Sequence, residues 1–152
     1  MTLMKLSEVC TIRYGKDHKK LSEGTVPVYG SGGVMRHVEK SLSLGPSVLI
    51  PRKGTLGNLF YSAGPFWTVD TLFWTEIKQD IVEPKYLYYA LRTKDLASLN
   101  IGTAVLSLST DVLNEVELEI PEKETQKRIA TLLGSIEDKI ESTAKLNDYL
   151  AA

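Results

Sequence analysis

The chain has 152 residues, which is enough for one domain with a modest appendage but cramped for two complete domains. Hydrophobic residues make up 43% and charged residues 24%, values that exclude disordered, collagen-like and disulfide-stapled classes. No stretch approaches the roughly 18 apolar residues that cross a bilayer, and the first residues lack the apolar segment of a signal peptide. We therefore expect a cytoplasmic protein without membrane contact.

The net charge is −1, but basic and acidic residues are unevenly distributed along the chain. Residues 1–60 hold nine lysines and arginines against four acidic residues, whereas residues 101–152 hold five basic residues against ten acidic ones. A basic surface is typical of proteins that bind DNA, because their affinity depends on neutralised phosphates. The first part of the chain is therefore the candidate for contact with a polyanion, and the last part could face water or a protein partner.

The N-terminal half of the chain predicts a sheet with many turns. Residues 5–12 are expected to form one short amphipathic helix, followed by a polar, basic loop over residues 13–25. Short β-type runs then alternate with glycine and proline up to about residue 77. The expected strands are residues 25–29, 34–38, 47–51, 58–62 and 71–77.

The second half predicts helices around one further strand. Pro84 is placed to begin a helix, so residues 84–99 are expected to form one or two short helices. Residues 116–120 alternate between apolar and acidic side chains and predict a strand with one buried face. After Pro121, a stretch without proline predicts one long helix over residues 122–150. The residues of the first helical segment expected to face inward are Leu87, Ala90 and Leu91.

The long helix carries an apolar stripe with the spacing of a heptad repeat. One interpretation is a terminal helix that folds back on its own sheet, and the other is a coiled coil with a second helix. Asn147 on the stripe favours the coiled coil, because a polar residue there fixes the register of paired helices. The residues predicted for dimerisation are Ile129, Leu133, Ile136, Ile140, Asn147 and Leu150.

Together these elements indicate an α+β fold. A small mixed sheet domain with short helices is expected over residues 1–121, followed by one long C-terminal coiled-coil helix over residues 122–152. The aromatic residues could stack on bases, but in a domain of this size most are expected to belong to the core. They are Tyr61, Phe66, Trp67, Phe73, Trp74, Tyr86, Tyr88 and Tyr89.

Two glycine-rich segments are candidates for close approach to a ligand. Residues 29–33 lack the residue order of a P-loop or a dinucleotide-binding fingerprint, so they form either a tight turn or a loop whose backbone approaches a ligand. Residues 50–58 offer the same choice, with two basic side chains directly after a buried strand. We expect three basic loops to line one DNA-facing surface, namely residues 13–20, 30–36 and 52–58. The residues predicted to contact DNA are Arg13, Lys16, Lys19, Lys20, Ser31, Arg36, Arg52, Lys53, Thr55 and Asn58.

The sequence contains no evident set of catalytic residues. Its serines lie outside the GxSxG pattern, and neither His18 nor His37 has an evident orienting acid. The single Cys10 belongs to no metal-binding spacing, so neither a metal site nor an internal disulfide is expected. The aromatic tetrapeptide typical of amino-methyltransferases of nucleic acids is also missing. We therefore expect a chain that catalyses nothing alone, although residues distant in sequence could still converge on a pocket.

Several stretches, taken in order, resemble the DNA-specificity (S) subunits of type I restriction-modification systems. The most specific is the last, in which a proline and a Gln-Lys-Arg-Ile helix follow a strand. The matching segments span nearly the whole chain and read PVYGSGGV, VLIPRKGTLGN, FWTVDTLFW, EPKYLYYALR, NIGTAVLSLSTDVLNEVELEIP and PEKETQKRIATLLGSIEDKIE.

The resemblance implies a target recognition domain that reads one half of a bipartite site in double-stranded DNA. It also implies a non-catalytic chain that directs a partner adenine methyltransferase (M) subunit and a restriction (R) subunit to that site. S-adenosylmethionine, ATP and Mg would be used by these partners, and this chain would need no cofactor. The chain departs from the family in holding one such domain and one helix where the usual subunit holds two of each. It is therefore expected to be a half-subunit, or a fragment ending at residue 152.

A half-subunit has to pair with a second copy to read a two-part site, and the stripe supplies the surface for a homodimer. In an antiparallel pair the two-fold axis would fall between Lys139 and Ile140. The stripe from Ile129 to Leu150 covers 22 residues, or about 33 Å, which is close to the roughly 34 Å of one DNA turn. Parallel pairing stays open.

The alternative to DNA recognition is a coiled-coil protein-interaction module without DNA binding, in which the basic patch is ordinary solvated surface. Salt-dependent DNA binding separates the two hypotheses, because only phosphate neutralisation gives a steep dependence on salt. The sequence does not predict which bases are read, since base contacts depend on a few loop side chains.

Overall fold

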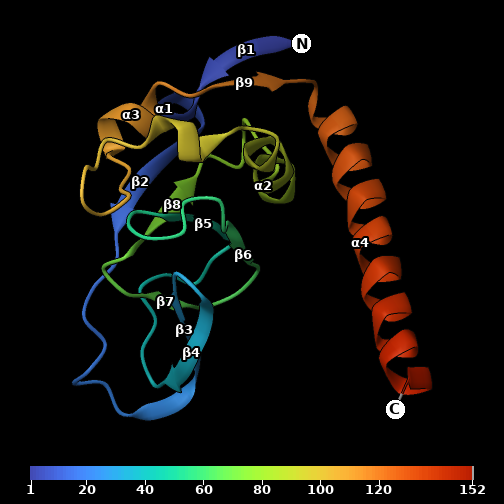
Figure 1. The fold of residues 1–152 in the computed structure, drawn as a ribbon. Coiled ribbons are helices and arrows are strands. Elements are labelled where there is room, and N and C mark those ends of the chain that lie inside the picture. Colours follow the sequence, from blue (N-terminus) through green and yellow to red (C-terminus); the bar gives the residue numbers. More distant parts are fainter. Residues whose placement is uncertain (152) are drawn as a thin grey trace.

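The computed structural model describes residues 1–151 and consists of a β-rich body beside one long helix (Figure 1). The strands are β1 (Thr2–Lys5), β2 (Cys10–Tyr14), β3 (Glu23–Gly30), β4 (Gly33–Val38), β5 (Ser47–Pro51), β6 (Phe60–Ser62), β7 (Trp67–Thr68), β8 (Leu72–Ile77) and β9 (Glu117–Ile120). The helices are α1 (Leu6–Val9), α2 (Pro84–Arg92), the 3-10 helix η1 (Leu96–Leu99), α3 (Thr110–Asn114) and α4 (Lys123–Ala151). The α+β class expected from the sequence is thereby confirmed.

Three small sheets build the body. The largest has the strand order β2-β8-β5-β6 with antiparallel pairs throughout. A second sheet has the order β4-β3-β7, in which β3 and β4 form an antiparallel hairpin and β7 runs parallel to β3. The third pairs β1 with β9 and so joins the two ends of the body, directly before α4 begins.

The main core lies where the four-stranded sheet meets the short helices. All five residues of β5 are buried, which agrees with a continuous apolar strand in the middle of a domain. Leu87 and Leu91 of α2 are fully buried against this sheet, and Ala90 is partly buried, as their spacing predicts. On β5 and β8, the buried hydroxyls of Ser47 and Thr75 hydrogen-bond each other and the adjoining backbone.

The expected helix over residues 5–12 is wrong in extent. Only Leu6–Val9 are helical, with the Glu8 carboxylate accepting a hydrogen bond from the backbone amide of Lys5. Cys10–Tyr14 instead pair with β8, because tertiary strand pairing outweighs the weak helical preference of so short a segment. The sequence also did not predict β1, β7 or α3. The five strands expected between residues 25 and 77 all occur, with ends shifted by a few residues.

Helix α4 begins and ends within one residue of its expected bounds and lies along one side of the body (Figure 1). Within residues 1–151, no helix is both long and apolar enough to span a bilayer. The division into domains at residues 121 and 122 stays a prediction, and its last residue, 152, lies outside the described residues.

Candidate nucleic-acid interface

Loops from five parts of the chain meet on the body, and those of residues 15–22 and 100–107 project away from α4 (Figure 1). We call this the loop face and define it by the segments that contact one another there. These segments are residues 17–19, 30–32, 52–54, 69–71 and 106–108. Three of them come from loops that the sequence predicts to bind DNA.

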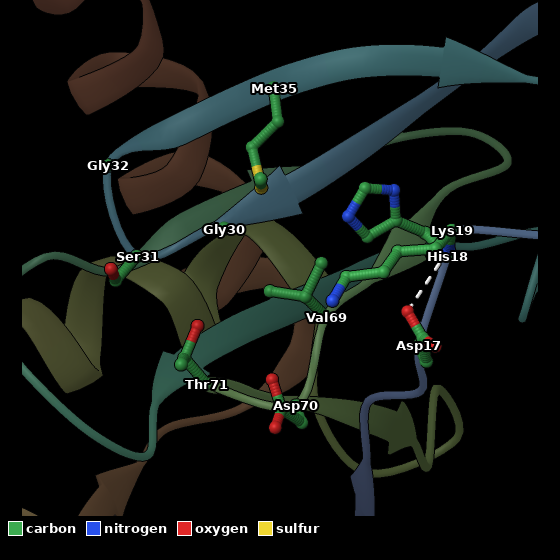
Figure 2. Close-up of a pocket in the computed structure, with 10 residues that line it drawn as sticks. All are labelled: Asp17, His18, Lys19, Gly30, Ser31, Gly32, Met35, Val69, Asp70 and Thr71. Atoms are coloured by element: carbon green, nitrogen blue, oxygen red, sulfur yellow. Dashed lines mark hydrogen bonds between the residues drawn. The ribbon is translucent and has the colours of Figure 1, made fainter.

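A hollow of about 660 Å³ lies at the centre of the loop face (Figure 2). Its lining residues are Asp17, His18, Lys19, Gly30, Ser31, Gly32, Met35, Val69, Asp70 and Thr71. Figure 2 shows the side chains of His18 and Lys19 on one side, those of Ser31 and Thr71 on the other, and Val69 between them. The hollow therefore combines an apolar centre with a rim of charged and hydroxyl groups.

The β3–β4 hairpin forms one wall of the hollow. Gly30 pairs with Gly33 across a two-residue turn, so residues 29–33 form the tight turn that is one of their two expected structures. Gly33 has a φ of 114°, a conformation that a residue with a side chain rarely adopts. A Cβ added at Gly54 would lie 3.9 Å from the Ser31 hydroxyl, which places the hairpin turn beside the loop after β5.

The turn between β7 and β8 forms the floor of the loop face and is held by several hydrogen bonds. The Leu72 amide donates to the Val69 carbonyl at 3.1 Å and closes a turn around Asp70 and Thr71. The Arg52 amide donates to the Thr71 carbonyl at 2.8 Å, and the Arg52 guanidinium donates to the Asp70 carbonyl at 3.2 Å. This turn is therefore positioned by the loop that follows β5.

The predicted DNA-contacting lysines are exposed. None of their ammonium groups has a hydrogen-bond or ion-pair partner within residues 1–151, so each is available to a phosphate. Thr55 and Asn58 are likewise exposed, and Ser31 lines the hollow. These lysines are Lys16, Lys19, Lys20 and Lys53.

The three predicted arginines are engaged with protein groups. Arg13 forms a two-point ion pair with Glu76 at 3.1 and 3.2 Å. Arg36 is half-buried and donates to the carbonyls of His18 and Leu21 and to the Glu23 carboxylate at 2.7 Å, so it holds the loop between β2 and β3. The guanidinium of Arg52 lies over the Tyr14 ring, 5.2 Å from its centre. The DNA contacts of these three arginines stay a prediction.

Sequence reasoning missed two parts of the loop face. The first is Asp70–Thr71, a single turn whose position depends on strand pairing. The second is the loop of residues 100–107, where the Gly54 amide donates to the Leu106 carbonyl at 3.0 Å and the Leu108 amide to the Arg52 carbonyl at 2.8 Å. A usable signal was the Asn-Ile-Gly sequence at residues 100–102, because the Asn100 amide oxygen accepts hydrogen bonds from the Gly102 and Ser107 amides.

Most aromatic side chains belong to the core, as the sequence predicts. Phe66, Phe73, Trp67 and Trp74 are buried, and the two indole N–H groups donate to the carbonyls of Lys16 and Tyr14. Burial raises the pKa of the Cys10 thiol to about 12, so this cysteine is unreactive at neutral pH. No group of metal-ligating side chains occurs among residues 1–151.

Helix α4 is fixed to the body near its first turns. The side chain of Gln126 is 1% exposed; its oxygen accepts from the Glu83 amide at 2.7 Å, and its nitrogen donates to the carbonyls of Ile81 and Pro121. Further along, Glu137 accepts hydrogen bonds from Tyr89 and Arg92. Desolvation and the bond to Glu137 raise the pKa of the Tyr89 hydroxyl to about 12.

The apolar stripe of α4 is only partly covered by its own body. Ile129 and Leu133 line a groove of about 390 Å³ between α2, β9 and α4. Beyond Glu137 the stripe is in water, with Ile140 64% exposed and Leu150 71% exposed. The fold-back interpretation therefore holds for the first turns of the helix and not for its distal half.

These features define an α+β domain with a hollowed loop face and a long C-terminal helix. The chain matches the sequence model of the type I restriction modification DNA specificity domain over residues 1–152. It therefore belongs to that family, as its motifs predict.

Curated relatives agree with this assignment. The chain is 29% identical over 140 residues to the N-terminus of a type I specificity subunit of Mycoplasma pneumoniae, covering 86% of this chain and 75% of the relative. It is 31% identical over 134 residues to the specificity subunit of the type I restriction enzyme MjaIX of Methanocaldococcus jannaschii, covering 81% of this chain and 31% of the relative. The chain thus spans most of the first relative and about a third of the second.

Solved structures share the fold. The S subunit of a type I restriction-modification system from M. genitalium superposes with a TM-score of 0.80 at 18% identity, covering 95% of this chain and 41% of that one. The HsdS subunit from Thermoanaerobacter tengcongensis gives a TM-score of 0.67 at 18% identity, covering 93% and 38%. The fold of this chain accordingly corresponds to less than half of each of these two subunits.

Proposed function

We propose that the chain is a sequence-specific DNA recognition subunit of a type I restriction-modification complex and reads one half of a bipartite site. The observation that carries this proposal is the family match over residues 1–152. The loop face is compatible with it, because its hollow is lined by the unpaired Lys19 and further exposed lysines lie in the adjoining loops, and phosphate binding requires such groups.

In this proposal the residues of the loop face and of the loops adjoining it divide into two roles. Lys16, Lys19, Lys20 and Lys53 contact phosphates and position the duplex, because their flexible ammonium groups are unpaired. We assign Ser31, Thr55 and Asn58 to base edges, because their accessible hydroxyl and amide groups can donate and accept hydrogen bonds. Arg13, Arg36 and Arg52 could reach DNA only by giving up or sharing the partners described above, so we assign them first to holding the loops in place.

The chain has no catalytic role in this proposal. It would bring an M subunit and an R subunit to the DNA, and these partners would use S-adenosylmethionine, ATP and Mg, so the chain itself would need no cofactor. Incubation of the chain alone with S-adenosylmethionine and duplex DNA is expected to give no methylation. Methylation at one product per chain or more would contradict this assignment.

We further propose that two copies pair through α4. A second copy of the helix would bury the apolar side chains that are exposed beyond Glu137. In an antiparallel pair with its two-fold axis between Lys139 and Ile140, Leu150 of one copy would lie next to Ile129 of the other. Ile129 and Leu133 line an open groove of mixed polar and apolar side chains, which could receive that end of the partner helix. Such a pair would hold two loop faces at opposite ends of the helices, as a two-part site requires.

The test of the proposed function is the salt dependence of DNA binding. Fluorescence anisotropy of a labelled duplex pool at several salt concentrations is expected to show affinity that falls steeply with salt, because several lysines displace counterions. Weak binding without a dependence on salt would instead support the protein-interaction module without DNA binding.

A further inference from the structure

We infer that the carboxylate of Asp70 reads the exocyclic amine of a cytosine in the major groove. This inference rests on the proposed function and assigns a base to one position of the loop face. It concerns the hollow of Figure 2, where Asp70 lies between Val69 and Thr71.

The Asp70 carboxylate is free to bind a ligand. The other carboxylate of the hollow, on Asp17, accepts a hydrogen bond from the Lys19 amide at 3.0 Å (Figure 2). Asp70 is exposed, and within residues 1–151 its carboxylate has neither a hydrogen bond nor an ion pair. The neighbouring Arg52 donates to the backbone carbonyl of Asp70, not to its carboxylate, and lies over the Tyr14 ring.

The backbone of Asp70 is held in place by hydrogen bonds within the protein. It occupies a central position of the turn closed by the Leu72 amide, and the neighbouring Thr71 carbonyl accepts from the amides of Arg52 and Lys53 at 2.8 and 3.3 Å. The Val69 amide donates to the Tyr29 carbonyl of strand β3 at 3.1 Å. A backbone held in this way does not have to be ordered on binding, so only the side chain of Asp70 loses conformational freedom when it meets a base.

The negative charge of Asp70 restricts which groups of DNA it can contact. A carboxylate that faces DNA is repelled by phosphates, so it weakens binding unless it meets a hydrogen-bond donor. In the major groove guanine presents only acceptors, thymine an acceptor and a methyl group, and adenine an amine beside the acceptor N7. Cytosine presents the N4 amine alone, which makes it the base that a carboxylate favours.

The apolar side of the hollow agrees with this assignment. Met35 and Val69 line the same space as Asp70, and Met35 is 57% exposed. A cytosine whose N4 amine meets Asp70 would present its C5–H edge to a neighbouring surface, and an apolar side chain suits that edge because no polar group is left unpaired there.

The experiment is a selection from a pool of random duplexes, carried out with the unmodified chain, Asp70→Asn and Asp17→Asn. The unmodified chain is expected to enrich cytosine at one position of its half-site. Asp70→Asn is expected to lower that preference by about 5- to 150-fold and to shift it towards adenine, whose N6 and N7 match an amide. Asp17→Asn is expected to keep the cytosine, because its carboxylate is already engaged within the loop.

A second measurement uses the unmodified chain alone and so does not depend on a variant that folds. In the selected duplex, the cytosine is replaced by a pyrimidin-2-one nucleotide, which lacks the N4 amine. The affinity of the unmodified chain is expected to fall by a factor similar to that for Asp70→Asn, whereas the affinity of Asp70→Asn is expected to change little.

Two outcomes would overturn the inference while leaving the proposed function in place. One is a selected site with unchanged base preferences in Asp70→Asn, and the other is a folded Asp70→Asn that loses affinity for all sequences equally. If the unmodified chain enriches no sequence at all, the proposed function fails and the inference fails with it.

Discussion

Lysines and arginines on and beside the loop face have different surroundings, so their substitution should have different effects on DNA binding and on stability. Lys19 and Lys20 are exposed and unpaired, so changing both to alanine should weaken binding to every duplex alike. The slope of log affinity against log salt should fall by about one for each lysine. Anisotropy titrations measure both effects, with Lys127→Ala on α4 as the control. A salt slope unchanged in the double variant would place these lysines away from DNA.

Arg36 should act on stability before it acts on DNA. Its guanidinium satisfies two backbone carbonyls and the Glu23 carboxylate while half-buried, so Arg36→Ala should lower the free energy of unfolding by about 1 to 3 kcal/mol. Arg13→Ala is the matched control, because its pair with Glu76 is exposed and should contribute at most about 1 kcal/mol. Urea denaturation compares the two. Equal effects would mean that Arg36 does not hold the β2–β3 loop.

At the scale of elements, the start of α4 depends on one buried amide. Gln126→Leu removes the partners of the Glu83 amide and of the Ile81 and Pro121 carbonyls. The expected loss of stability is about 1 to 3 kcal/mol, because these backbone groups would stay buried without hydrogen bonds. Gln79→Leu, at an exposed position nearby, should change stability by less than about 0.5 kcal/mol and serves as the control. Calorimetry or urea denaturation that finds equal values would contradict this role.

The elements that the sequence predicts well are those with a local signal. Strand β5 is a run of apolar residues ending at a proline, and α4 is a long stretch without helix breakers, so both were predicted closely. Strand β1 was missed because its partner β9 lies more than a hundred residues away, and β7 because only two residues pair with β3. Such pairings depend on tertiary context, which cannot be predicted from the β-propensity of a short segment.

The same contrast applies to the loop face. Its lysines could be found from charge, and the turn at residues 29–33 from its glycines. Asp70 could not be found, because one acidic residue between two strands has no distinguishing pattern and its place in the hollow follows from the β7–β8 turn. The hydrogen bonds of the Arg36 guanidinium could not be predicted either, because the groups that accept them lie in the β2–β3 loop and at the start of β3.

At the scale of the whole molecule, the chain should form a dimer through α4. Each exposed large aliphatic side chain of the stripe contributes about 1.5 to 3 kcal/mol when buried, although the entropy of association offsets much of this. Sedimentation equilibrium should therefore show dimers at tens of micromolar, on the order of a weak specific interface. The double variant Ile136→Asp and Ile140→Asp should be monomeric and folded. A monomeric unmodified chain would contradict the pairing.

The direction of pairing can be measured with cysteines, because the native Cys10 is buried and does not compete. A variant carrying both Ile129→Cys and Leu150→Cys should form cross-links between copies if the helices are antiparallel. Leu150→Cys alone should then give none, since the two copies of that residue lie at opposite ends. Efficient cross-linking of Leu150→Cys alone would indicate a parallel pair.

Specific recognition of DNA by this chain can be measured as the ratio of two affinities. The affinity of the chain for its selected duplex is compared with its affinity for a scrambled duplex of equal length, at physiological salt. We predict a ratio on the order of 10³, the lower bound typical of specific DNA-binding proteins. Equal affinity for the two duplexes would show that the loop face binds phosphates without reading sequence, and it would contradict the proposed function.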